Sequence, residues 1–246
     1  MTEALIAVPA YEQSSDQEVA FQAVDYILRV LKKNMVFGMT WGRAMHEFVE
    51  QLAKDERLRS LSFQNVKVVP FLGTPGAIQS DSWNTTTYSN TLATKVGNLL
   101  HCASYNLSAP MYVEGTKEKE LIESIDEIAK VLHMAETADI ALIGIGSMQD
   151  DSSIIKAEIR TREEYKELVR KGAVGEIVGR IYDKNGQTVD EDLKRKMVGI
   201  SLDKIAKIPV RVGMSYGKDK IEAIKGAIAG GSVSYTHLRA HETRRH

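Results

Sequence analysis

The stretch IALIGIGS, residues 140–147, carries the strongest strand signal in the chain. Its first six residues are apolar apart from Gly144, and a short apolar run that ends near glycine is typical of a buried strand. Apolar residues at helical spacing precede it from Ile122 to Leu132, which predicts a helix there. A helix followed directly by a buried strand is the repeating unit of an α/β fold.

The same alternation of element types extends outward in both directions from this stretch. It predicts strands at residues 4–8, 35–38, 66–71, 175–183 and 209–212, and helices at residues 15–31, 45–52, 84–97, 161–171 and 218–228. We therefore predict an α/β domain with a mostly parallel sheet and helices on both faces.

The composition is that of an ordinary globular protein. The chain has 246 residues, of which 43% are hydrophobic and 26% charged, and this length suits one large domain or two small ones. A core of this size needs no disulfide or structural metal, and a single cysteine, Cys102, excludes a disulfide within the chain. A lone thiol fits a reducing compartment, so we expect a cytoplasmic protein.

Charge and hydropathy exclude two further classes of partner. No apolar run approaches the roughly 20 residues of a membrane span, so we expect no membrane partner. The formal net charge is −1, which does not favour direct binding of nucleic acid.

The last 14 residues, VSYTHLRAHETRRH, follow no apolar period. They resemble the translation of sequencing-adapter DNA, so we expect residues 233–246 to be a non-native tail and leave them out of the fold prediction. Residues 1–232 then form the single functional domain. The spacing of His237 and His241 could suit a metal on a helix, but chance is the better interpretation in such a tail.

Several predicted strands end in glycine-containing turns, at Gly38, at Gly73 and at Gly144 with Gly146. In open α/β sheets, ligands bind in the crevice beyond the carboxyl ends of the strands. We expect these turns to face one such crevice.

The turn GMTWGR, residues 38–43, joins a predicted strand to a predicted helix. Helix N-termini favour anions, Gly42 would let a ligand approach the backbone, Thr40 adds a hydroxyl and Arg43 could bind a phosphate with two hydrogen bonds. A tight structural turn with Trp41 in the core explains the same residues equally well, and both interpretations stay open.

The other candidates each have a structural explanation as well. The loop containing Gly73, Thr74 and Gly76 is typical of a plain surface loop, Asp183 could cap a turn rather than bind hydroxyls, and Lys220 could be a solvated lysine at a helix start. Gly144 and Gly146 lack the third glycine of the dinucleotide fingerprint, so we expect no nicotinamide cofactor.

No catalytic or metal-binding constellation is evident. The histidines at positions 46, 101 and 133 share no ligand spacing, Cys102 has no His–Asp partner pattern, and Ser147 lacks the context of a nucleophile elbow. We therefore expect no cofactor, no metal and no enzymatic activity.

An ordered set of short segments resembles the effector-binding domain of the SorC family of sugar-responsive transcriptional regulators. The resemblance covers about residues 5–231, and GAVGEI is its most specific segment. The segments are MTWGR at 39–43, Asn84 at the start of a helix ending in Gly97, GIGS at 144–147, GAVGEI at 172–177 followed by Tyr182-Asp183, and Gly217-x-x-Lys220.

The resemblance implies a fold like that of glucosamine-6-phosphate deaminase and ribose-5-phosphate isomerase. It also implies binding of a small, usually phosphorylated sugar, control of DNA through an N-terminal helix-turn-helix that this chain lacks, and a homo-oligomer, either a dimer or a tetramer. The ligand-binding residues that it implies, together with the turn candidates, are Thr40, Trp41, Gly42, Arg43, Gly73, Thr74, Gly76, Asn84, Gly144, Gly146, Ser147, Asp183 and Lys220.

Three functions remain in competition. The first is a sensor that binds a sugar phosphate without transforming it. The alternative is a sugar-phosphate isomerase or deaminase on the same fold, for which Asp183 is the only base that can be placed in the crevice. The third is an interaction domain without a small ligand.

Overall fold

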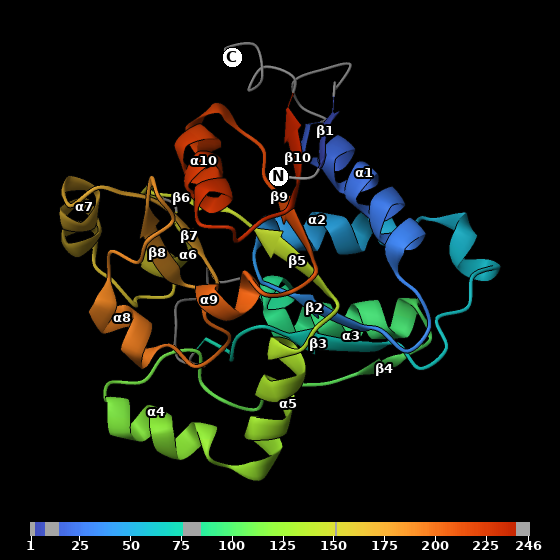
Figure 1. The fold of residues 1–246 in the computed structure, drawn as a ribbon, viewed down its shortest axis with the longest axis horizontal. Coiled ribbons are helices and arrows are strands. Elements are labelled where there is room, and N and C mark those ends of the chain that lie inside the picture. The colour runs from blue at the N-terminus through green and yellow to red at the C-terminus, as the bar shows by residue number, and fades with distance from the viewer. Residues whose placement is uncertain (1–2, 8–14, 76–84, 151, 240–246) are drawn as a thin grey trace.

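The computed structural model describes residues 3–7, 15–75, 85–150 and 152–239, and its centre is a seven-stranded sheet with all strands parallel (Figure 1). The strand order is β1-β10-β9-β5-β2-β3-β4, so β5, which has the strongest strand signal in the sequence, is the middle strand. This confirms the predicted fold class. The strands are β1 (Glu3–Ala7), β2 (Val36–Met39), β3 (Lys67–Pro70), β4 (Ala103–Ser104), β5 (Ile140–Gly144), β9 (Val210–Met214) and β10 (Tyr235–Arg239).

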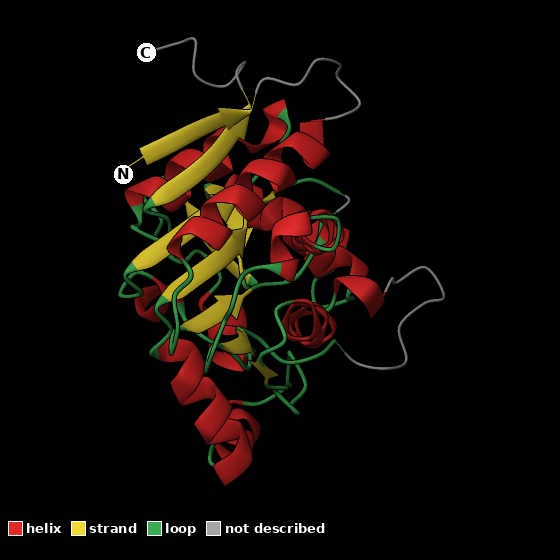
Figure 2. Ribbon diagram, turned by 90° about the vertical axis from the view of Figure 1, so that its right-hand side faces the viewer, coloured by secondary structure: helices red, strands yellow, loops and turns green. Residues whose placement is uncertain are grey.

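Helices cover both faces of this sheet because successive side chains of each strand point to opposite sides (Figure 2). In β5, Ile140 and Leu142 pack with the helices α1 (Ser15–Val30), α2 (Arg43–Leu52) and α3 (Ser89–Leu99). Ala141 and Ile143 pack on the other face, with α5 (Asp126–Glu136), α9 (Leu202–Ile205) and α10 (Ile221–Ala229).

A second, three-stranded antiparallel sheet lies beside the first, with the order β6-β7-β8. Its strands are β6 (Gly146–Ser147), β7 (Ala173–Ile177) and β8 (Arg180–Asp183). The short helices around it are α6 (Ser153–Lys156), α7 (Arg162–Arg170) and α8 (Glu191–Lys196). Thr161 and Glu164 form the capping box that begins α7.

The predicted single strand over residues 175–183 is wrong, since the structure has two strands joined by a turn at Val178 and Gly179. The turn carries no strong sequence signal, because valine favours strands. Gly38 is not a turn residue either. It lies inside β2, where a Cβ would overlap the ring of Phe71.

Two predicted helices are each divided in the structure. The helix expected up to Leu132 consists of α4 (Thr116–Glu123) and α5, with a break at Ser124 and Ile125. The helix expected at 218–228 consists of the short 3-10 helix η4 (Lys218–Lys220) followed by α10. Two further 3-10 helices among the described residues are η2 (Glu56–Arg59) and η3 (Thr85–Thr87).

Strand β10 lies between β1 and β9, where Tyr235 is paired with Glu3 on one side and Val212 on the other. Five residues of the segment 233–246, which is predicted to be non-native, thus form an inner strand of the sheet. Their non-native origin is a separate question, which the strand does not test, and it stays a prediction. Among the described residues, no helix is long and apolar enough to cross a membrane.

Candidate functional site

Four adjacent strands, β9, β5, β2 and β3, bring their carboxyl ends to the same edge of the large sheet (Figure 1). The chain leaves β2 at Thr40, β5 at Ile145 and β9 at Ser215. Parallel strands place these exits side by side, so the predicted turns do meet at one edge.

Thr40 joins two of these strand ends. Its side chain is fully buried, and its Oγ1 accepts a hydrogen bond of 2.9 Å from the backbone N–H of Gly144. A Cβ on Gly144 would lie 3.3 Å from the carbonyl oxygen of Trp41, so glycine permits the close packing. Trp41 is 5% exposed and belongs to the hydrophobic core, as the structural interpretation of this turn expected.

Two helix N-termini meet at the end of β2. Gly42 precedes α2 with φ of 103°, a left-handed conformation that favours glycine, and its N–H donates 3.0 Å to the carbonyl of Thr87 just before α3. Ser89, at the start of α3, donates 3.1 Å to the carbonyl of Met39. Neither helix has an acidic residue in its first turn, and Arg43 begins α2, so the local field favours an anion.

Hydrogen bonds hold the segment η4 against the residues that follow β5. Lys220 Nζ donates a hydrogen bond of 3.0 Å to the carbonyl of Ile145. Ser147 Oγ donates 2.7 Å to a carboxylate oxygen of Asp219. The predicted site residues Lys220 and Ser147 are therefore linked through η4 to the end of β5, where Gly144 is bonded to Thr40.

Glu176 lies in this network, although sequence reasoning did not select it as a site residue. It pairs with Gly146 across β6 and β7, and a Cβ on Gly146 would lie only 2.7 Å from its Oε1. Its Oε2 accepts 2.9 Å from the N–H of Gly179. Burial raises the pKa of this carboxyl, against the opposing effects of the Gly179 hydrogen bond and the charges of Lys220 and Arg180.

A signal for Glu176 was present in the sequence. Residues 173–182 read AVGEIVGRIY, and the only charged residues in this apolar segment are Glu176 and Arg180. Charged side chains in a buried segment need a partner or a function. The two are 6% and 2% exposed, so both are buried in the folded chain.

Gly73 and Thr74 follow β3, and both are held by contacts within the protein. Gly73 needs to be glycine because a Cβ would lie 2.6 Å from the carbonyl oxygen of Pro110. The Thr74 hydroxyl accepts 2.8 Å from the Asn90 amide. This fits the interpretation as a structural loop, and their ligand contacts stay predictions. Gly76 and Asn84 lie outside the described residues.

Asp183 is bonded into the turn after β8 and has no hydrogen bond to the network above. Its Oδ1 accepts from the N–H groups of Asn185 and Gln187 at 2.9 and 2.8 Å, and these bonds, that of Gln187 first, lower the pKa of the carboxyl. The structural interpretation of Asp183 as a turn cap therefore fits, and its contact with a ligand stays a prediction.

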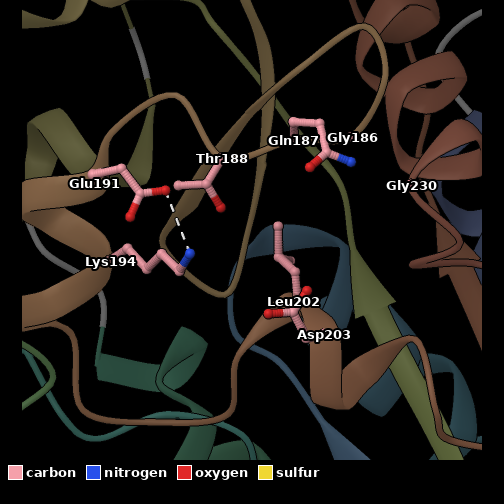
Figure 3. A pocket seen from close by; sticks show the side chains of 8 residues that line it. All are labelled: Gly186, Gln187, Thr188, Glu191, Lys194, Leu202, Asp203 and Gly230. Atoms are coloured by element: carbon pink, nitrogen blue, oxygen red, sulfur yellow. Dashed lines mark hydrogen bonds and ion pairs between the residues drawn. The ribbon is translucent and has the colours of Figure 1, made fainter.

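A cavity of about 150 Å³ lies beside this turn rather than among the residues of the strand-end network (Figure 3). An ion pair between Glu191 and Lys194, at 3.3 Å, crosses its wall. The residues that line it are Gly186, Gln187, Thr188, Glu191, Lys194, Leu202, Asp203 and Gly230.

The described residues hold no cluster of three or more His, Cys, Asp and Glu that could bind a metal ion. Burial raises the pKa of the half-buried Cys102 thiol to about 11, so it stays protonated at neutral pH. The arrangement at the strand ends can bind an anion and accept hydrogen bonds from hydroxyl groups.

Comparisons with known proteins agree with this chemistry. A family model described as "Putative sugar-binding domain" matches residues 1–237. The transcriptional regulator LsrR of Escherichia coli O9:H4 (strain HS) is 28% identical over 216 residues, which cover 86% of this chain and 62% of that protein. The sorbitol operon regulator of Klebsiella pneumoniae is 28% identical over 204 residues, covering 82% and 61%. The chain thus spans less than two thirds of the length of these curated relatives.

Solved structures share the fold. The full-length sorbitol operon regulator SorC from Klebsiella pneumoniae superposes with a TM-score of 0.84 at 24% identity, over 97% of this chain and 74% of that one. A transcriptional regulator from Streptococcus pneumoniae TIGR4 gives a TM-score of 0.86 at 21% identity, over 98% and 89%.

Proposed function

The chain belongs to the family of sugar-binding domains, in agreement with its resemblance to SorC regulators, and on that premise we propose that it senses a small phosphorylated sugar and controls a DNA-binding domain. The observation that carries the proposal is the meeting of the N-termini of α2 and α3 with Lys220 at the carboxyl ends of β2 and β5. The relatives named above are transcriptional regulators, which supports a sensor over an enzyme.

The two ends of a sugar phosphate would use different parts of the crevice. The phosphate would lie at the start of α2, where the positive end of the helix dipole, Arg43 and Lys220 favour negative charge. The hydroxyl groups would donate to the carboxylate of Glu176, which stands opposite Gly146. The lack of a side chain at Gly146 leaves room for that carboxylate, because a Cβ there would lie 2.7 Å from its Oε1.

Ligand binding would act on DNA through a shift between two arrangements of subunits. A ligand changes such an equilibrium only by the difference in its affinity for the two states. The segment η4 is a suitable point of difference, since Lys220 donates a hydrogen bond to Ile145 and Asp219 accepts one from Ser147. The proposed assembly is a dimer or tetramer of a cytoplasmic protein.

The isomerase or deaminase alternative has less support. Proton abstraction beside a carbonyl needs a positioned base, and Asp183, the base expected from the sequence, is bonded into its own turn. The proposed sensor needs no covalent step.

The test is calorimetric titration with fructose 6-phosphate, glucose 6-phosphate, sorbitol 6-phosphate and inorganic phosphate, with product analysis after incubation. We expect saturable binding of at least one sugar phosphate without conversion, and a loss of about tenfold or more in Lys220→Ala, since hydrogen bonds to charged groups contribute about 1.5–3 kcal/mol. Lys218→Ala is the matched control, because Lys218 lies in the same short helix but is exposed. Absence of binding, or turnover of a ligand, would overturn the sensor.

A further inference from the structure

The turn between β7 and β8 has an unusual backbone. Val178 and Gly179 both have positive φ, 55° and 68°. Glycine adopts this conformation freely, whereas a β-branched residue is strained there, and such strain persists only where the surroundings enforce it. Val178 is 1% exposed, so the enforcing contacts lie inside the protein.

Two buried charged side chains hold the two residues of this turn. Glu176 Oε2 accepts from the N–H of Gly179 at 2.9 Å, and Arg180 Nη1 donates to the carbonyl of Val178 at 3.2 Å. The structure gives no ion pair between the two side chains, so each acts on the backbone. The turn therefore determines where the Glu176 carboxylate lies, and Arg180 helps to determine the turn.

Arg180 also anchors the turn to a distant part of the chain. Its Nη2 donates to the carbonyls of Met197 and Gly199, both at 3.2 Å. Residues 197–200 are in turn bonded to the segment after β3, where Gly73 N–H donates to the carbonyl of Val198. Arg180 Nε has no hydrogen-bond partner within the described part of the chain.

A buried arginine that lacks a direct carboxylate partner is costly, and an apolar residue of similar size is often at least as stabilising. Stability alone therefore does not account for Arg180. Its position is accounted for if the Glu176 carboxylate must be held at one place in the crevice.

We propose that Arg180 is a positioning residue of the crevice, which acts through the Val178–Gly179 turn to hold the Glu176 carboxylate opposite Gly146. The inference rests on the proposed function of the crevice. Because Glu176 would receive the hydroxyl groups and not the phosphate, Arg180 sets the affinity for the sugar part of the ligand alone.

Charged and titratable groups face this pair from three sides. Lys220 from η4 and Tyr182 from β8 interact electrostatically with Glu176. Glu123 from α4 interacts with Arg180. Burial lowers the pKa of the nearby Lys119, and the charge of Arg180 lowers it further. The positive charges of Lys220 and Arg180 both favour the ionised form of Glu176, so removal of Arg180 moves the pKa of that carboxyl further upward.

The test uses Arg180→Met, Arg180→Lys, Glu176→Gln and the double variant Arg180→Met/Glu176→Gln, each titrated with fructose 6-phosphate and with inorganic phosphate. We expect Arg180→Met and Glu176→Gln each to lose about tenfold in affinity for fructose 6-phosphate and to stay within about twofold for inorganic phosphate. The double variant should lose no more than Glu176→Gln alone, because Arg180 acts through Glu176. Additive losses, or full affinity in Arg180→Met, would overturn the proposal.

A second measurement tests the proposal without ligand, in case Arg180→Met folds poorly. Arg180→Lys keeps the charge and Arg180→Gln keeps hydrogen-bond donors, so both are compared by melting temperature against pH in the absence of ligand. In Arg180→Gln the pH range over which Glu176 lowers stability should extend upward, and in Arg180→Lys it should stay as in the wild type. If the pH profile of Arg180→Gln were identical to that of the wild type, Arg180 would not act on Glu176 and the proposal would be overturned. A wild-type protein that binds neither probe would instead refute the proposed function, and the pH profiles would still decide whether Arg180 acts on Glu176.

Discussion

The two sheets of this domain bury different kinds of side chain. The large parallel sheet buries apolar side chains on both of its faces, as Ile140 and Ala141 of β5 illustrate. The small antiparallel sheet buries Glu176 and Arg180 together with Tyr182. The large sheet therefore supplies stability, and the small sheet supplies polar chemistry beside the crevice at a cost in stability.

The largest expected effect concerns the core of the large sheet. Phe37 in β2 is fully buried, and its ring lies edge-on to that of Phe48 in α2 at 6.3 Å. Phe37→Ala should lower the free energy of unfolding by about 3–5 kcal/mol, measured by urea denaturation. The control is Phe21→Ala on α1, where the ring is 47% exposed and the loss should be below about 1 kcal/mol. Equal losses would show that burial in the core of the large sheet does not determine how much stability such a variant loses.

The next effect should fall on ligand affinity rather than on stability. Gly146→Ala places a Cβ 2.7 Å from Glu176 Oε1, so the carboxylate has to move. Affinity for a sugar phosphate should fall about tenfold, roughly 1.4 kcal/mol, while affinity for inorganic phosphate stays the same. An unchanged affinity for the sugar phosphate in calorimetry would remove Glu176 from the hydroxyl side of the site.

A third variant tests whether the stability of α7, which packs on the small sheet, affects ligand binding. Thr161→Ala removes the side-chain cap of α7 and should cost about 1 kcal/mol in thermal or urea unfolding. Because the cap lies outside the strand-end network, ligand affinity should not change. A parallel loss of affinity would mean that α7 and the small sheet respond as one unit.

The smallest expected effect is a change in the slope of stability against pH. The pKa of Glu176 is raised in the folded protein, so above the ordinary pKa range of glutamate the unfolded chain releases its proton first. Glu176 therefore makes stability fall as pH rises from that range up to its raised pKa, and Glu176→Gln should remove this fall. Melting temperatures in buffers from pH 4 upward measure it, with Glu163→Gln on α7 as an exposed control. A slope that persists in Glu176→Gln would assign it to another group.

Strands β1, β2, β3, β5 and β9 of the large sheet could be predicted from sequence because each is a short apolar run next to a helical pattern. Strands β4 and β10 were not predicted, because β4 has only two residues and β10 reads YTHLR, which has no apolar pattern. The contacts of Thr40 and Lys220 at the strand ends followed from that topology, since parallel strands carry their exits to one edge. The small sheet could not be predicted in the same way. Valine at position 178 indicates a strand, whereas in the structure it lies in a turn that Glu176 and Arg180 contact by hydrogen bonds.

Three residues of the predicted turns have structural roles that the sequence left open. Gly38, Gly73 and Asp183 are residue types that serve both turns and ligands, and spacing does not separate the two uses. In the structure Gly38 makes room for an aromatic ring, Gly73 for a neighbouring backbone, and Asp183 caps its own turn. Glu176 was not selected as a site residue because the apolar residues around it indicate a strand, and a single charged residue within a strand does not by itself indicate a binding site.

The position of β10 has a consequence for how the molecule is made. Strand β1 has one neighbour in the described sheet, and that neighbour is β10, more than 200 residues later in the chain. During synthesis the first strand therefore emerges from the ribosome long before its partner exists, and it can join the sheet only after β10 has been translated. Docking of residues 3–7 is thus a late step with a high loop-closure cost, and a hydrogen-exchange pulse during refolding would label their amides after those of β5 are already protected.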